Sequence, residues 1–264
     1  MNRISFNFRD TTTVITGGSS GIGLASAELI AKSGGDVIVS ASRVPSKTII
    51  ALEKIRAASL ESGRQGALIE ALPYEADDEV SVQEFFQKVK AFGKRVDFLI
   101  HSPGISPDTP YSEQDAKLWN KVLSVNTTGT HLAAKYMRGI MREQEIVDEV
   151  RGKIVLITST NGVDSYGIFS AAYDASKAAT NNMVRNFGED FHKEDDIVIN
   201  GLAPGWINTE LNNTLPPEER EKEMAKIWSR RFAETNEMAV NAAALLTLPY
   251  VSGRVHMADG GYRS

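Results

Sequence analysis

Tyr173 and Lys177 are the first residues whose types and spacing could do chemistry. They are four residues apart in a segment with a helical pattern, so both side chains project from one face of the predicted helix. A tyrosine exchanges a proton near neutral pH only if the pKa of its phenol falls from about 10, and a protonated lysine beside it stabilises the phenolate. A pair with this spacing also arises by chance, so other segments must support this interpretation.

Polar residues at three other places could complete such a site. Ser159 follows an apolar run that predicts a strand, and its hydroxyl could bind a substrate oxygen or merely cap the strand. Asn126 lies among residues that compete for backbone hydrogen bonds, which predicts either a simple helix kink or a carbonyl group open to water. Residues 204–209 follow another predicted strand and would lie where a nicotinamide ring binds.

A glycine-rich loop joins the first predicted strand to the first predicted helix. Gly17, Gly21 and Gly23 allow a sharp turn and let a phosphate approach the amides at the helix N-terminus. The loop predicts a dinucleotide site, with a glycine-rich turn without a ligand as the alternative. The same residues match the G-x-S-x-G nucleophile elbow of hydrolases around Ser19. Only 18 residues precede Ser19, too few for the earlier strand that an oxyanion hole requires.

Short β-branched runs alternate with helical patterns along the chain. Strands are predicted over residues 12–16, 36–40, 67–72, 96–101, 153–159, 197–203 and 255–258. Helices are predicted over residues 21–33, 46–62, 79–92, 112–141, 170–192 and 234–246. The alternation predicts one α/β domain over residues 1–264, with a parallel sheet covered by helices on both faces. A substrate lid is predicted around residues 206–233, where no strand pattern occurs.

Composition restricts the class of protein further. The net charge of −5 argues against a polycationic nucleic-acid-binding surface. The absence of cysteine excludes disulfides, iron–sulfur clusters, thiolate zinc sites and a cysteine nucleophile. The four histidines are too scattered to predict a metal site. No window holds the roughly 18 uncharged apolar residues of a membrane span, so we expect a cytoplasmic protein without a membrane partner.

Taken together, these residues resemble the short-chain dehydrogenase/reductase family of the classical type over essentially the whole chain, including members that act as 3-oxoacyl-acyl-carrier-protein reductases. The glycine loop, Asn126, Ser159, the Tyr173–Lys177 pair, residues 204–209 and a closing Asp-Gly-Gly at 259–261 occur in the family's order. The resemblance implies a Rossmann-type three-layer sandwich and a seven-stranded parallel sheet of order 3-2-1-4-5-6-7. It also implies hydride transfer between a nicotinamide cofactor and a carbonyl/alcohol pair.

The resemblance further implies a role for each residue. Tyr173 would be the general acid/base and Ser159 would orient the substrate oxygen. Lys177 would bind the nicotinamide ribose and tune the phenol, and Asn126 would hold a relay water. The cofactor-binding residues that it implies are Gly17, Ser19, Ser20, Gly21, Ile22, Gly23, Ser42, Arg43, Gly104, Asn126, Tyr173, Lys177, Pro204, Gly205, Ile207 and Thr209.

Two departures from the family pattern concern the site. His-Ser-Pro-Gly at positions 101–104 stands where the family usually has Asn-Asn-Ala-Gly, so the amide side chains that normally brace the central sheet are missing. The segment between positions 162 and 173 is one residue longer than in the commonest members, which would place Thr160 at the catalytic serine in a gapless alignment. The S-x-x-G pattern favours Ser159, and Thr160 is the alternative.

The resemblance also bears on the choice of cofactor. Members specific for NAD place an acidic residue at the end of the second strand, and residues 37–52 contain no Asp or Glu. Asp36 lies about 20 residues beyond the glycine loop, as the dinucleotide fingerprint requires, but it begins the predicted strand. Ser42 and Arg43 follow that strand and suit the 2′-phosphate of NADP. The sequence therefore predicts a preference for NADP(H), with NAD(H) as the alternative.

The substrate is less determined than the reaction, because the fold serves many substrates. Apolar side chains in the lid predict a small, partly apolar carbonyl or alcohol. Reduction of 3-oxoacyl groups on acyl carrier protein is an alternative that the net negative charge disfavours, since an acidic carrier needs a basic docking face. A nicotinamide-sensing regulator is another alternative, although a sensor does not need the acid/base tyrosine. The resemblance implies a homo-oligomer, a tetramer or a dimer.

Overall fold

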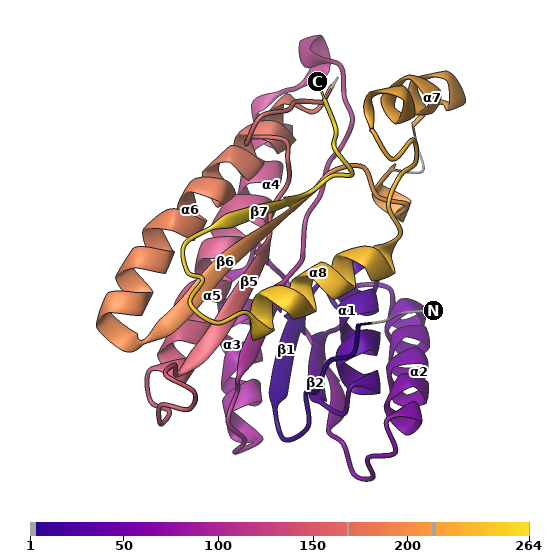
Figure 1. Cartoon of the computed structure of the whole chain (residues 1–264). Coiled ribbons are helices and arrows are strands. Elements are labelled where there is room, and N and C mark those ends of the chain that lie inside the picture. Colours follow the sequence, from indigo (N-terminus) through magenta and orange to yellow (C-terminus); the bar gives the residue numbers. More distant parts are fainter. Residues whose placement is uncertain (1–3, 168, 213–214, 264) are drawn as a thin grey trace.

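Seven parallel strands form one sheet in the order β3-β2-β1-β4-β5-β6-β7 (Figure 1), which confirms the expected Rossmann-type topology. The computed structural model describes residues 4–167, 169–212 and 215–263. The strands are β1 (Thr12–Thr16), β2 (Asp36–Ser40), β3 (Ile69–Leu72), β4 (Phe98–His101), β5 (Gly152–Ile157), β6 (Ile197–Pro204) and β7 (Val255–Ala258). Every predicted strand is present, and β3, β4 and β5 are shorter than predicted.

Helices cover both faces of the sheet (Figure 1). One face carries α1 (Gly21–Lys32), α2 (Pro45–Glu61) and α8 (Thr235–Thr247), and the other carries α3 (Glu79–Ala91), α5 (Gly129–Met141) and α6 (Ala171–Asp195), with α4 (Ala116–Leu123) packed against α6. Neighbouring strand residues face opposite cores: Val14 joins the core beneath α3 and α5, and Ile15 joins the core beneath α1 and α8. This explains why the strands are apolar without alternation.

The predicted helix over 112–141 is broken at Asn126. A short 3₁₀ turn (Tyr111–Glu113) precedes α4, and a π-helical turn (Ser124–Thr128) separates α4 from α5. The Oγ1 of Thr130 donates to the carbonyl oxygen of Asn126 at 2.6 Å, a side-chain bond of the kind that bends helices. The predicted interruption is therefore confirmed.

Helix α7 (Pro217–Lys226) lies within the predicted lid, after a 3₁₀ turn at Glu210–Asn212. The sequence pattern predicts no helix there, although Pro217 occupies the first helical turn, where proline is favoured. Figure 1 shows α7 away from the sheet, beyond the end of α8. Positions 213 and 214 of the predicted lid lie outside the described residues. In the described part of the chain, no helix is long and apolar enough to span a membrane.

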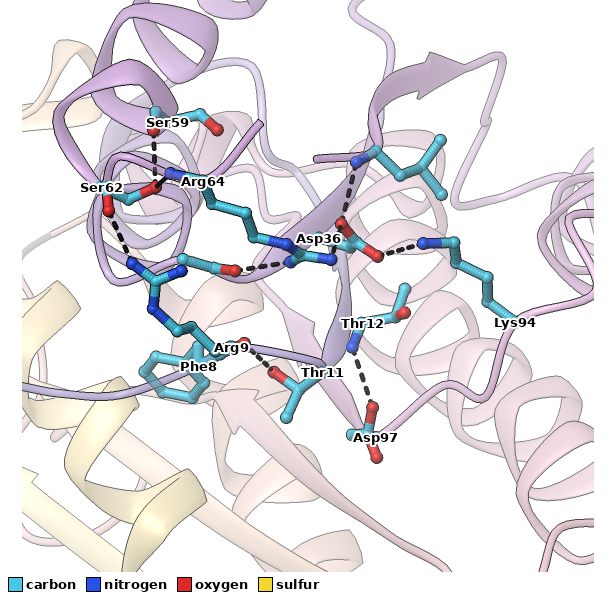
Figure 2. Close-up of polar contacts among 12 residues, drawn as sticks. Phe8, Arg9, Thr11, Thr12, Asp36, Ser59, Ser62, Arg64, Lys94 and Asp97 are labelled. Carbon is cyan, nitrogen blue, oxygen red and sulfur yellow. Dashed lines mark hydrogen bonds and ion pairs between the residues drawn. The ribbon is translucent and has the colours of Figure 1, made fainter. Parts of the chain in front are cut away.

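Asp36 has a structural partner set at the amino end of β2 (Figure 2). Its carboxylate, 2% exposed, pairs with Lys94 at 2.5 Å and with Arg64 at 3.1 Å, and accepts a hydrogen bond from the Leu68 amide at 2.8 Å. A buried carboxylate needs such partners. Asp36 therefore begins β2 and holds β3 beside it, as its position in the sequence predicts, and lies at the opposite end of the strand from the cavity described below.

His101 links the central strands, although positions 101–104 lack the asparagine side chains that usually brace them in the family. Thr16 and His101 are register partners on β1 and β4, and the threonine Oγ1 lies 2.8 Å from the histidine Nδ1. The ring is 1% exposed, and its Nε2 has no hydrogen-bond partner among the described residues. Burial, and then the charge of Lys177, lower the pKa of His101 to about 3. A neutral imidazole thus replaces the usual amide as the link between the central strands.

This depressed pKa predicts a loss of stability in mild acid. Between pH 6.5 and about 3 the unfolded chain binds a proton at this residue and the folded chain does not, so the free energy of unfolding falls as the pH falls below 6.5, by at most about 1.4 kcal/mol per pH unit. His101→Asn cannot titrate and should lose this part of the slope. Urea unfolding at pH 5, 6, 7 and 8 measures it, with His192→Asn on an exposed position as the control. An unchanged slope in His101→Asn would contradict the assignment.

Candidate active site

A cavity of about 1940 Å³ lies at the carboxyl ends of the strands. Its lining comes from the glycine loop, the segments after β2, β3, β4, β5 and β6, helix α6 and helix α7. Every predicted cofactor-binding or catalytic residue lines it except Gly23 and Asn126. The parallel sheet therefore brings together residues that are far apart in the sequence, as predicted for a ligand crevice.

The glycine loop turns tightly against two neighbours. Gly17 has a φ of +74°, and a Cβ there would lie 2.8 Å from the Pro103 nitrogen. A Cβ at Gly23 would lie 2.2 Å from the Gly17 carbonyl oxygen, so Gly23 is required for packing rather than for lining the cavity. The Gly17 amide donates to the Ser40 Oγ at 2.7 Å, which ties the loop to the end of β2.

This loop fits the pyrophosphate of a dinucleotide. The N-cap residue of α1, Ser20, makes no side-chain hydrogen bond to the helix, so its side chain does not satisfy the first amides, which point to the cavity edge with the positive end of the helix dipole. The loop follows β1, the first strand in the described chain. No earlier strand there supplies the oxyanion-hole loop that a nucleophile elbow at Ser19 needs.

Tyr173 and Lys177 lie one turn apart on α6 and both line the cavity. The Lys177 Nζ lies 5.6 Å from the centre of the Tyr173 ring and donates to the Ile157 carbonyl oxygen at 3.0 Å. Burial lowers the pKa of Lys177 to about 8. The ammonium is thus held by the end of β5 beside the Tyr173 ring.

The pKa of the phenol differs from the expectation. Burial raises the pKa of Tyr173 to about 12, with smaller increases from Asp174 and Asp108, while a hydrogen bond with Ser159 lowers it. Desolvation of the phenolate outweighs the hydrogen bond that favours it, while the stabilisation of the phenolate by Lys177 stays a prediction. In this arrangement the tyrosine holds its proton and is an acid ready to donate it.

The structure distinguishes the two candidates for the substrate-orienting hydroxyl. Ser159 shares a hydrogen bond with Tyr173 and accepts one from the backbone amide of Asn161 at 3.1 Å. The Thr160 Oγ1 instead donates to the Pro204 carbonyl oxygen at 3.3 Å, and its amide donates to the same oxygen at 3.1 Å. The Thr160 hydroxyl therefore extends the pairing of β5 with β6. This geometry supports Ser159 as the orienting residue.

Asn126 lies behind the cavity wall and holds the segment that follows β4. Its side chain exchanges two hydrogen bonds with the backbone of Ile105, at 2.9 and 3.0 Å, and donates to the Ser176 Oγ at 2.9 Å. A Cβ at Gly104 would lie 3.6 Å from the Asn126 Oδ1 and 3.7 Å from the Lys177 Nζ. Asn126 therefore connects the π-helical turn to the cavity wall next to Lys177, while its proposed relay water stays a prediction.

The end of β2 carries a charge cluster that the sequence analysis did not predict. Arg43 forms ion pairs with Glu75 and with Asp77, the latter at 3.3 Å, and Asp77 also pairs with Lys121. Both acids line the cavity from the segment after β3. The sequence signal that could have placed both acids at the cavity was their position after a parallel strand, since every such segment reaches the same sheet edge.

Comparisons with known proteins agree with this geometry. A family model described as enoyl-(acyl carrier protein) reductase matches residues 17–263. The chain belongs to the short-chain dehydrogenase/reductase family. It is therefore an oxidoreductase of a family that uses NAD(P), as its resemblance to that family implies.

Three proteins are similar to this family member over nearly its whole length. The chain is 28% identical to cis-4-hydroxycyclohexanecarboxylate dehydrogenase of Sinomonas cyclohexanicum, over 97% of each chain. It is 29% identical to the crystal structure of levodione reductase, with a TM-score of 0.84, over 97% of this chain and 98% of that one. It is 25% identical to a 3-oxoacyl (acyl-carrier-protein) reductase from Agrobacterium tumefaciens C58 with NADP bound, with a TM-score of 0.84, over 97% and 95%.

In this family member the segment after β6 contacts α7 and Phe232 through Trp206. Trp206 stacks on Phe232 with ring centres 5.2 Å apart, and its Nε1 donates to the Glu223 Oε2 at 3.0 Å. The Tyr262 hydroxyl donates to the same carboxylate oxygen at 2.6 Å. Trp206 thus ties α7 to the segment after β6 and Tyr262 ties α7 to the C-terminal segment, both through Glu223, while Phe169, 53% exposed, lines the cavity.

The different contacts of the two hydroxyls predict different mutational effects. Ser159→Ala removes the group that touches Tyr173 and should lower kcat about 100-fold. Thr160→Ala removes one hydrogen bond to the β6 backbone and should lower kcat far less, with a loss of stability of about 1 kcal/mol. Steady-state turnover with one carbonyl substrate and thermal unfolding of both variants check this. A larger loss of kcat in Thr160→Ala would show that the orienting hydroxyl lies one residue later.

Proposed function

We propose that the protein transfers a hydride between NADP(H) and the carbonyl/secondary alcohol pair of a small, partly apolar substrate. The observation that carries the proposal is that Tyr173, Lys177 and Ser159 line the same cavity as the glycine loop. A phenol, a nearby ammonium and an orienting hydroxyl suit proton transfer to a carbonyl oxygen. The names of the cyclohexanecarboxylate dehydrogenase and the levodione reductase support this reaction class.

The chain's own groups supply proton transfer, orientation and charge. When bound, a reduced nicotinamide supplies the hydride that adds to the carbonyl carbon. Ser159 donates a hydrogen bond to the carbonyl oxygen, and Tyr173 gives that oxygen its phenolic proton as the π bond breaks. Lys177 stabilises the resulting phenolate by its charge. Alcohol oxidation reverses each step, with the phenolate as the base.

Three finer features belong to the same proposal. Residues 206–233, with α7 inside them, act as the substrate lid, and the hydrogen bond from the Tyr262 hydroxyl to Glu223 ties α7 to the C-terminal segment. The protein is a homo-oligomer, a tetramer or a dimer, which is supported by the exposure of Met257 on β7 and Tyr250 before it. The protein acts in the cytoplasm on a small molecule, which stays a prediction.

Reduction of 3-oxoacyl groups on acyl carrier protein remains the alternative substrate class. The NADP-bound relative carries that name, and the family model carries the name of an enoyl reductase. The net charge of −5 disfavours an acidic carrier. The complete set of Ser159, Tyr173 and Lys177 disfavours a nicotinamide sensor without activity, because a sensor has no use for an acid/base group.

A screen with a tyrosine variant tests the reaction. The substrates are ketones, secondary alcohols, polyols, 3-oxoacyl thioesters and enoyl thioesters, each with both cofactors. Tyr173→Phe should lower kcat 10²- to 10⁴-fold on every substrate that the wild type converts, because only the proton-transferring oxygen is lost. Its cofactor affinity, measured by the fluorescence of the reduced nicotinamide, should stay near that of the wild type. A variant that keeps more than a tenth of the wild-type rate would remove Tyr173 from this role.

The contacts of Arg43 make the cofactor preference testable. No acid ends β2, and Arg43 lines the cavity there, so we expect kcat/KM to favour NADPH over NADH by about 10- to 150-fold, the value of one charge-assisted contact set. Arg43→Ala should abolish the preference. Glu75→Gln removes a carboxylate that competes for the guanidinium and should increase it. Equal efficiency with both cofactors, or an NADH preference that Arg43→Ala leaves unchanged, would refute the proposed preference.

A further inference from the structure

The carboxylate next to the active-site tyrosine is the centre of a hydrogen-bond network. Asp174 lies in the first turn of α6. Its Oδ1 accepts from the Asn161 Nδ2 at 2.6 Å and from the Ser170 Oγ at 3.0 Å, and its Oδ2 accepts from the Gly167 amide at 3.0 Å. One side chain therefore holds both ends of the segment that joins β5 to α6.

The same network leads to the orienting hydroxyl. The backbone amide of Asn161 donates to the Ser159 Oγ at 3.1 Å, and that hydroxyl shares a hydrogen bond with Tyr173. The hydrogen bond that the Ser159 hydroxyl accepts restricts its rotation. The hydrogen of this hydroxyl then points away from Asn161 and can be donated to another acceptor. The chain of contacts runs from Asp174 through Asn161 to Ser159 and ends at the phenol of the neighbouring residue, Tyr173.

Besides this network, the chain after Ser159 contacts α6 directly at Gly162. Gly162 has a φ of +85°, and a Cβ there would lie 2.4 Å from the Ala178 amide nitrogen, so the segment packs directly on the helix. The Ser165 Oγ donates to the Asn161 Oδ1 at 3.4 Å. Ser170 is the N-cap of α6 but makes no capping bond with its side chain. Its hydroxyl serves Asp174 instead.

We propose that Asp174 is a positioning residue that sets the place of the Ser159 hydroxyl relative to Tyr173 through Asn161. The proposal rests on the proposed function and names a further residue for the same reaction. Asp174 is the residue after Tyr173 on α6, so the helix that presents the acid/base group also fixes the partner segment. The position of the Ser159 hydroxyl relative to the Tyr173 phenol matters because a displacement of about 1 Å can lower the rate about 100-fold.

A carboxylate suits this task better than an amide. It offers two acceptor oxygens to three donors. The side chain of asparagine has only one acceptor oxygen. Its NH₂ group would therefore face a donor, either the Gly167 amide or the side chains of Asn161 and Ser170. Its charge also strengthens each hydrogen bond. Asp174→Asn must therefore break part of the network while keeping the size of the side chain.

The charge of Asp174 gives a second, separable effect on the tyrosine. It raises the pKa of Tyr173, as does Asp108 from the segment after β4, while the Ser159 hydrogen bond lowers it. Lys177 faces the phenol from α6, and His101 on β4 lies close enough to Lys177 to be affected by its charge. From α7, Glu223 lines the same cavity but bonds to Trp206 and Tyr262. Removing the Asp174 charge therefore lowers the pKa of the phenol.

The test compares Asp174→Asn, Asn161→Ala and the double variant in alcohol oxidation over a range of pH. Each single variant should lower the plateau of kcat about 10- to 100-fold with little change in the cofactor KM. The double variant should be no slower than Asp174→Asn, because both break one chain of contacts. Both variants weaken the Ser159 hydrogen bond that lowers the pKa of Tyr173, and only Asp174→Asn also removes a charge that raises it. The acidic limb of Asp174→Asn should therefore lie at lower pH than that of Asn161→Ala.

Asp190→Asn is the matched control, since it removes an ion pair of the same helix, to Arg138 at 2.7 Å, away from the cavity. Thermal unfolding and cofactor titration of each variant report folding. An Asp174→Asn enzyme within twofold of the wild-type kcat, a kcat loss that Asp190→Asn shares, or additive losses in the double variant would each overturn the inference. An active wild type with any of these results leaves the proposed function standing. A wild type without turnover overturns both.

Discussion

All strands of the sheet run in the same direction, and the site depends on this constraint. The carboxyl ends of parallel strands meet at one edge, so the glycine loop after β1, the Arg43 segment after β2, Ser159 after β5 and residues 204–209 after β6 border one cavity. Each segment is short and individually unremarkable. The sheet makes them a site because it fixes their order and spacing.

Close backbone packing at that edge then determines which residues can stand there. Gly17 and Gly23 have no room for a Cβ, and the end of β5 is occupied by the Lys177 ammonium on the Ile157 carbonyl. The ring of Tyr173 lies 5.6 Å from this cation, and burial and the carboxylates of Asp174 and Asp108 raise the pKa of its phenol. Burial, more than any of these charges, sets the acidity of the phenol.

The strands, the glycine loop and the break at Asn126 could be predicted because their signals are local: β-branched runs, glycine spacing and residues that compete for helix bonds. Helix α7 was missed because its segment carries few apolar residues and begins with Pro216 and Pro217, which read as loop. The pairing of Arg43 with Glu75 and Asp77 was missed because the partners are more than 30 residues apart. The raised pKa of Tyr173 could not be predicted because residue spacing shows the nearby cation but not the desolvation of the phenol.

The replacement of the usual amides by His101 follows the same electrostatic logic. A buried imidazole beside Lys177 is stable only when neutral, since a second positive charge there would be desolvated and repelled. Neutral imidazole offers one acceptor and one donor, which is enough for the Thr16 hydroxyl across β1 and β4. It adds no charge to the wall that holds Lys177. The brace can therefore change from an amide to a histidine without altering the charge that acts on the phenol, provided that the pH stays well above the depressed pKa of the ring.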